Sequence, residues 1–167
     1  MTRYRLLIEY DGAPFAGWQR VGEGLPSVQA ALETAASAIA GEPIEVTGAG
    51  RTDAGVHALG QVAHLDMDKP LPPGRLRDAL NAHLRPWPVA VLAADPVDAD
   101  FHARFSAMGR LYRYRLIARR ADLALDRGRA WRLPREPDLA GVGLGAGYRV
   151  GAHEVSDGYR DLSVSVV

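Results

Sequence analysis

The sequence predicts an α+β fold of the ferredoxin-like type, a β-α-β-β-α-β chain forming an antiparallel sheet with both helices on one face. Residues 3–10, 61–67 and 88–94 carry β-prone patterns, whereas residues 28–39 and 74–84 repeat apolar side chains at helical spacing. The chain has 167 residues, 47% of them hydrophobic and 24% charged, which is enough to bury a core for such a unit.

The first three predicted elements are a strand, a helix and a short strand. Residues 3–10 (RYRLLIEY) end at an Asp-Gly pair that is typical of a turn. Ser27 stands at the N-cap position of a helix that Gly41 closes, and residues 43–47 (PIEVT) predict a short strand. The apolar positions that define the helix are Val28, Ala31, Leu32, Ala35 and Ile39.

The next three predicted elements are a strand, a helix and a strand. Residues 61–67 (QVAHLDM) alternate between two faces and follow a segment punctuated by glycines at 48–60. Residues 74–84 (GRLRDALNAHL) predict a helix that ends before Pro86, and residues 88–94 (PVAVLAA) complete the unit as a strand.

An extra strand and an incomplete second half are expected beyond this unit. Residues 109–117 (GRLYRYRLI) should extend the sheet, whereas the sequence after Pro137 is rich in glycine and offers one possible terminal strand. The expected organisation is a ferredoxin-like subdomain at 1–108, the start of a second subdomain at 109–137 and an aberrant or poorly structured tail at 138–167.

Charge and cysteine content narrow the classes of function. The net charge is zero, but residues 101–120 contain six arginines and no acidic residue, which suits contact with phosphates. Because cysteine is absent, disulfide scaffolds and thiolate metal sites are excluded. The sequence contains neither an apolar run near the ~20 residues of a membrane span nor a signal peptide, so we expect a cytoplasmic protein.

The segment with the clearest chemical signal is GAGRTDAGVHALGQV, residues 48–62, between two predicted strands. Its glycines allow a tight bend and the close approach of a ligand. Arg51 and Asp53 project from this bend, and a neighbouring arginine would keep the carboxylate ionised, as a nucleophile or base requires. Thr-Asp-Ala-Gly is also an ordinary turn sequence, so these residues alone leave catalysis and a plain turn both open.

The string GRTDAGVHA with the trailing GQV resembles the central motif of the tRNA pseudouridine synthase A family. Four further segments resemble that family in the same order and cover, with it, about residues 3–135. They are EYDGAPFAGWQR at 9–20, Ser-Val-Gln at 27–29, DFHARFS at 100–106 and LYRY at 111–114.

This resemblance implies an isomerase that converts uridine to pseudouridine at positions 38 to 40 of the tRNA anticodon stem-loop. It implies that Asp53 is the catalytic residue, although whether it attacks the sugar, attacks the ring or acts as a base stays open. By the same resemblance Arg51 contacts RNA and Tyr112 packs against the target base, while His57 is expected in the pocket wall and Arg104 near the RNA backbone. The resemblance also implies a homodimer and no metal or organic cofactor.

Several neighbouring residues allow two interpretations. Phe101, His102 and Phe105 suit contact with an RNA backbone, but each could equally be plain surface or core. Trp18 is expected to pack near the site, and His64 to be structural. The histidines lack the spacing of metal ligands, so we expect no metal site.

The resemblance weakens toward the end of the sequence. Members of the family are longer, and their second half supplies a basic residue that pairs with the motif aspartate. We expect that a truncation or frameshift replaced this continuation after about residue 140 and that activity is weak or absent. A non-catalytic RNA-binding remnant is therefore the alternative, and a small hydrolase using Asp53 and His57 is disfavoured because no activated serine or cysteine accompanies them.

Overall fold

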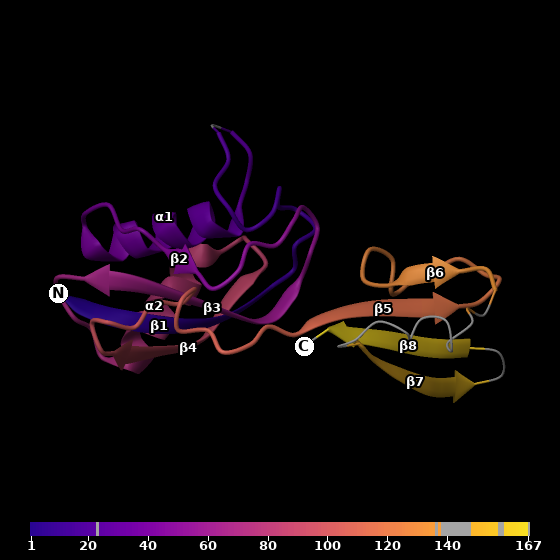
Figure 1. The fold of residues 1–167 in the computed structure, drawn as a ribbon. Helices are drawn as coiled ribbons and strands as arrows, with labels where there is room; N and C mark the ends of the chain where they lie inside the picture. Colours follow the sequence, from indigo (N-terminus) through magenta and orange to yellow (C-terminus); the bar gives the residue numbers. More distant parts are fainter. Residues whose placement is uncertain (23, 136, 138–147, 157–158, 167) are drawn as a thin grey trace. The chain divides into compact units, whose positions relative to one another are not determined.

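The computed structural model describes residues 1–22, 24–135, 137, 148–156 and 159–166. The chain forms two compact units, Met1–Ala107 and Met108–Val167. Figure 1 shows the helices and strands of both.

The first unit is a four-stranded antiparallel sheet with two helices, in the strand order β2-β3-β1-β4. This order agrees with the predicted ferredoxin-like arrangement and confirms the α+β class. The elements are β1 (Thr2–Tyr10), α1 (Val28–Ala40), β2 (Thr47–Gly48), β3 (Ala58–Met67), α2 (Pro73–Leu84) and β4 (Val89–Val97).

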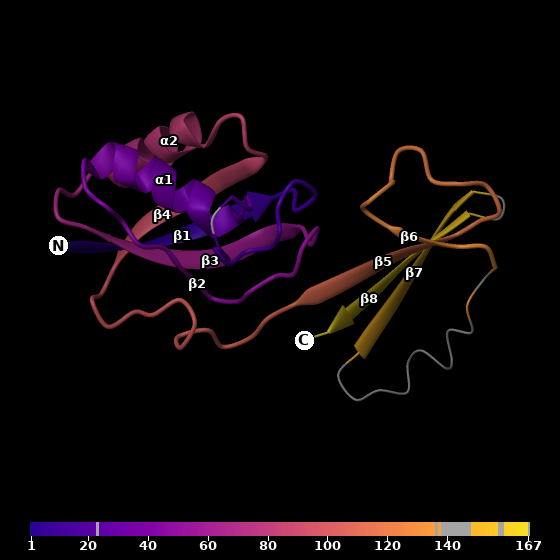
Figure 2. The same ribbon diagram turned by 90° about the horizontal axis from the view of Figure 1, so that it is seen from above.

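One face of this sheet carries the core. Alternate residues of β1 are fully buried and belong to one cluster with apolar side chains of both helices, so α1 and α2 cover the same face (Figure 2). The opposite face holds polar side chains such as Arg3 and Arg5. The core residues of these three elements include Tyr4, Leu6, Ile8, Val28, Leu32, Leu76, Leu80 and Leu84.

The predicted ends of α1 are confirmed. Ser27 Oγ accepts a hydrogen bond from Ala30 N at 3.2 Å, which satisfies one of the free amides of the first turn. Gly41 closes the helix in the left-handed conformation, with a φ of 78°. Helix α2 begins at Pro73 and ends before Arg85, which precedes a proline and is extended.

The strand predicted at 43–47 is shorter in the structure and shifted to Thr47–Gly48. The reason is that α1 binds the backbone just before it, so those groups are not available for a sheet ladder. Backbone groups of Ile44 and Val46 are hydrogen-bonded to Ser37 Oγ at 2.9 Å, Glu33 Oε1 at 3.3 Å and Gln29 Nε2 at 3.0 Å.

Strand β4 lies at an edge of the sheet, and a side chain of α2 occupies part of that edge. Asn81 Oδ1 accepts from Val91 N at 2.8 Å, and Asn81 Nδ2 donates to Val91 O at 2.9 Å. One amide group thus pairs both backbone groups of an edge residue, as a neighbouring strand would.

Replacing Asn81 with leucine is expected to lower the free energy of unfolding by about 1–3 kcal/mol, because both backbone groups of Val91 lose their partner. Urea denaturation measures this change. The control is Thr34→Ala on the exposed side of α1, where the hydroxyl donates only to Ala30 O of its own helix. We expect the control to stay within about 0.5 kcal/mol of wild type, and an equal loss in both variants would contradict the prediction.

The second unit holds a sheet of its own, in the order β6-β5-β8-β7. The expectation that residues 109–117 extend the first sheet is wrong, because β5 pairs in parallel with β6 and antiparallel with β8. The sequence predicts one terminal strand and the structure describes two, which pair with each other. The elements are β5 (Tyr112–Ala118), β6 (Trp131–Leu133), β7 (Tyr148–Ser156) and β8 (Tyr159–Val166).

Candidate functional site

The residue before Asp53 is held from two sides. Thr52 O accepts a hydrogen bond from Trp18 N at 2.9 Å, and Thr52 Oγ1 lies 2.8 Å from Tyr10 Oη. Tyr10 and Trp18 are buried, at 4% and 2% exposure, and their rings are in contact. The residues around 10–18 therefore form a rigid support for the bend at 50–57, which we call the motif bend.

The residues after Asp53 are held as well. Asp53 O accepts from Val56 N at 3.2 Å, closing a turn in which Gly55 has a φ of 77°. Gly55 N also donates to Phe15 O at 3.3 Å. The motif bend is thus an ordinary turn by its geometry, and the contacts on both sides of Asp53 fix where its carboxylate leaves the chain.

Two glycines allow the segments to come this close. A Cβ on Gly12 would lie 2.1 Å from Val56 O, and a Cβ on Gly48 would lie 2.5 Å from the Trp18 ring. Both distances are far below van der Waals contact, so neither position has room for a side chain. Trp18 is a packing residue beside the site, as predicted.

Asp53 and Arg51 are both exposed. The ion pairs found in the described part of the chain do not include one between them, so the local pairing that the sequence predicts is not present in this structure. A carboxylate that projects into solvent from a fixed bend is open to a ligand.

His57 joins the same two segments. Its Nδ1 lies 3.0 Å from Asp11 Oδ1 and 3.1 Å from Gly12 N, and both side chains are partly buried. An unprotonated Nδ1 accepts from the Gly12 amide, whereas a protonated one donates to the carboxylate of Asp11. Sequence reasoning placed Asp11 in a turn and in the family-like segment at 9–20 but gave it no role of its own. No local signal could have linked it to a histidine 46 positions away.

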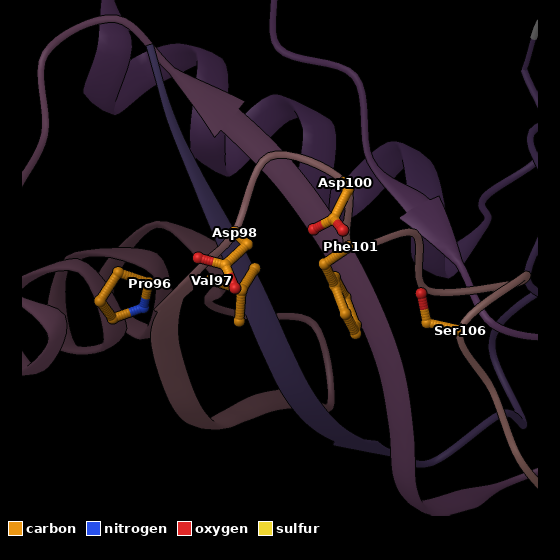
Figure 3. A pocket seen from close by; sticks show the side chains of 6 residues that line it. All are labelled: Pro96, Val97, Asp98, Asp100, Phe101 and Ser106. Atoms are coloured by element: carbon orange, nitrogen blue, oxygen red, sulfur yellow. The ribbon is translucent and has the colours of Figure 1, made fainter.

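Arg104 lies in a segment, residues 98–106, that follows β4. Arg104 and Phe105 are exposed there, the latter at 78%. Figure 3 shows a pocket lined partly by this segment, with the carboxylates of Asp98 and Asp100 on its wall. Since two carboxylates repel phosphate, we do not assign this pocket to nucleic acid.

His64 and Asp66 lie on the sheet beneath this segment. Asp66 accepts two hydrogen bonds from Arg3, at 2.8 and 2.7 Å, and the bond from Arg3 lowers the pKa of this carboxyl. Burial lowers the pKa of His64, and the charges of Arg3 and His102 lower it further, whereas Asp66 opposes the shift. His64 is 6% exposed, which agrees with the structural role expected of it.

The lowered pKa of His64 predicts how stability depends on pH. Below its ordinary pKa of 6.5 the unfolded chain binds a proton that the folded chain does not, so the free energy of unfolding should fall as the pH drops through this region. Urea denaturation between about pH 7.5 and 5.5 measures the slope. His64→Asn should flatten it, whereas alanine in place of the exposed His83 should leave it unchanged. An unchanged slope in His64→Asn would contradict the assignment.

A family model and the sequences of three relatives indicate the same family. The family model described as tRNA pseudouridine synthase matches residues 6–106. The chain is 59% identical over 161 residues to tRNA pseudouridine synthase A of Rhodopseudomonas palustris (strain BisA53) and 58% identical to that of Bradyrhizobium diazoefficiens, in each case over 96% of this chain and 65% of the relative. It is 56% identical over 156 residues to the protein of the same name from Paramagnetospirillum magneticum, over 93% of this chain and 60% of the relative.

The chain belongs to the tRNA pseudouridine synthase family. The family match contains Asp53, Arg51, His57 and Arg104, whereas Tyr112 lies beyond it. Because the matches with the first two relatives span 161 of 167 residues, they also extend past residue 140. The chain spans about 65% of the length of these relatives.

Tyr112 lies in the second unit, as the first residue of β5, and is 43% exposed. Tyr114 on the same strand is 65% exposed. An exposed tyrosine ring is free to stack on a base, as the family resemblance implies for Tyr112.

The described residues contain neither a cluster of metal ligands nor a helix that could span a membrane. This part of the chain has no group of three or more His, Cys, Asp or Glu side chains arranged to hold a metal ion. The helices described here are too short or too polar to cross a membrane.

Proposed function

We propose that this chain contributes the catalytic aspartate of a tRNA pseudouridine synthase, and that Asp53 is that residue. Family membership supports the reaction. The observation that carries the assignment is the position of Asp53, whose exposed carboxylate leaves a bend that is anchored at Thr52 on one side and Gly55 on the other. A reacting group held in this way loses little freedom when substrate binds.

The reaction breaks the bond between N1 of uracil and C1′ of ribose and forms a new bond from C5 to C1′. The proton on C5 is lost to solvent, and N1 gains a proton. Asp53 can take part as a nucleophile toward the sugar or the ring, or as a base. The target base must first leave its stack, which costs a few kcal/mol and is offset by contacts in the site.

The proposed substrate is the anticodon stem-loop of tRNA at positions 38 to 40, bound by a cytoplasmic homodimer. Arg51 and His57 border Asp53 along the motif bend, and Arg104 extends the basic character of residues 101–120. We assign Tyr112 to stacking against the target base. Affinity for tRNA should therefore fall steeply as salt is raised, because phosphate contacts release counterions.

The test is tritium release from an unmodified tRNA transcript that carries uridine labelled at C5. Release by this chain supports the proposal, and its loss when positions 38 to 40 are replaced by cytidine supports the proposed target. Salt-sensitive binding of tRNA without any release would instead support a non-catalytic RNA-binding protein. The observation that favours this second function is that the chain spans only about 65% of the length of its relatives.

A further inference from the structure

Four polar side chains lie on the sheet face that the helices leave uncovered. In the ladder between β1 and β3, Arg3 stands opposite Asp66 and Arg5 stands opposite His64. Residues opposite each other in a ladder share a face, and their neighbours Tyr4 and Leu65 point to the core on the other side.

This polar face binds the backbone of the 98–106 segment. His64 Nδ1 accepts a hydrogen bond from Ala103 N at 3.2 Å, and both residues are buried. Arg3 Nη1 donates to Ala99 O at 2.7 Å and to Phe101 O at 2.8 Å. Three backbone positions of the segment are therefore fixed to two strands of the sheet.

The tip of the segment is organised around His102. Its Nδ1 accepts from Arg104 N at 3.2 Å, and Ser106 Oγ accepts from His102 N at 3.0 Å. The His102 ring also packs on the Phe105 ring, with 4.4 Å between centroids. Arg104 and Phe105 are exposed at this tip, immediately after the buried Ala103.

We propose that His64 is a positioning residue for RNA binding, which holds Ala103 through its neutral ring and so fixes Arg104 and Phe105 for contact with RNA. The contact with RNA rests on the function proposed above, whereas the attachment of Ala103 to His64 does not.

The side chain at position 64 must place a hydrogen-bond acceptor where His64 Nδ1 lies, opposite the Ala103 amide. The buried Ala103 amide would lose its partner if the acceptor moved, and a buried amide without a partner is costly. Charged or titratable groups around His64 are Arg3 and Arg5 on β1, Asp66 on β3 and His102 in the segment. The neutral ring avoids placing a further positive charge beside the two arginines.

Asparagine and glutamine provide a matched test. The Oδ1 of asparagine can take the place of Nδ1, whereas the longer glutamine carries its oxygen toward the place of Nε2. We expect the Ala103 amide to keep its protection from hydrogen exchange in His64→Asn. In His64→Gln the protection factor of this amide should fall about tenfold or more. Equal protection of Ala103 in wild type and both variants would overturn the proposal, independently of any RNA.

A double-mutant cycle with an unmodified tRNA transcript tests the link to RNA. Arg104→Ala should weaken binding about tenfold in wild type and in His64→Asn, but less than about twofold in His64→Gln, where Arg104 is no longer positioned. A general loss of stability would not remove the effect of Arg104 selectively. The same tenfold loss in all three backgrounds would overturn the proposal, whereas wild type that does not bind tRNA would overturn the proposed function.

Discussion

Replacing Asp53 with asparagine is expected to reduce tritium release from C5-labelled tRNA by about 10⁴-fold or more, the range seen when a reacting side chain is removed. Asparagine keeps the shape of the side chain but can neither attack as an anion nor accept a proton as a carboxylate does. The motif bend should survive, because its hydrogen bonds near Asp53 involve the backbone of Thr52, Asp53 and Gly55.

Two measurements separate this loss of chemistry from a loss of folding or binding. Because Asp53 is exposed, the free energy of unfolding measured by urea denaturation should stay within about 0.5 kcal/mol of wild type, and tRNA affinity should change little. Asp68→Asn serves as the control, since Asp68 is an exposed carboxylate that directly follows the C-terminal end of β3, whereas the motif bend precedes the N-terminal end. Full turnover by the Asp53 variant would refute the assignment of the catalytic residue.

Features that depend on neighbouring residues were predicted well. Residues within a few positions of each helix end determine where the helix begins or stops. Examples are the cap at Ser27, the left-handed residue Gly41 and the end of α2 before Pro86. The order of strands and helices then leaves few ways to cover the apolar face of β1, so the arrangement of the first sheet could be expected from the pattern.

Features that depend on distant partners were missed. The strand at 43–47 is shortened by side chains of α1, and β5 joins β8 across more than 40 positions of sequence. Nothing in the sequence of β5 shows that its partner is β8. Likewise, nothing in the sequence of α1 shows that its side chains bind the backbone at 43–47. Strand pairing is decided by which partner is available in space, and sequence periodicity does not contain that information.

The candidate site also combines a residue that the sequence indicated with contacts that it did not. Asp53 was named because the motif resembles a family, since the residues alone also fitted a plain turn. Contacts from Tyr10, Trp18 and Phe15 hold the bend that carries Asp53, and Asp11 contacts His57. Each of these contacts joins positions that are far apart in sequence. These contacts have no local signature apart from the glycines that permit close approach, and that signal has meaning only once the two segments are known to meet.

Replacing Gly12 with alanine is expected to lower the free energy of unfolding by about 3 kcal/mol, near the upper end for an overpacked site. The new methyl group would lie 2.1 Å from Val56 O and 2.9 Å from the Gly55 carbonyl carbon. Both are backbone atoms, which cannot turn aside as a flexible side chain can. The segment around Gly12 or the motif bend must therefore move.

Gly74→Ala provides the matched control, since a Cβ there meets nothing within 4 Å and Gly74 lies inside α2. Alanine favours the helix, so the control should gain up to about 1 kcal/mol in urea denaturation while Gly12→Ala loses stability. The bend that Gly12→Ala displaces also carries Asp53, so its turnover should fall by more than its affinity for tRNA does. Unchanged stability of Gly12→Ala would mean that the two segments are not in the contact on which the position of Asp53 depends.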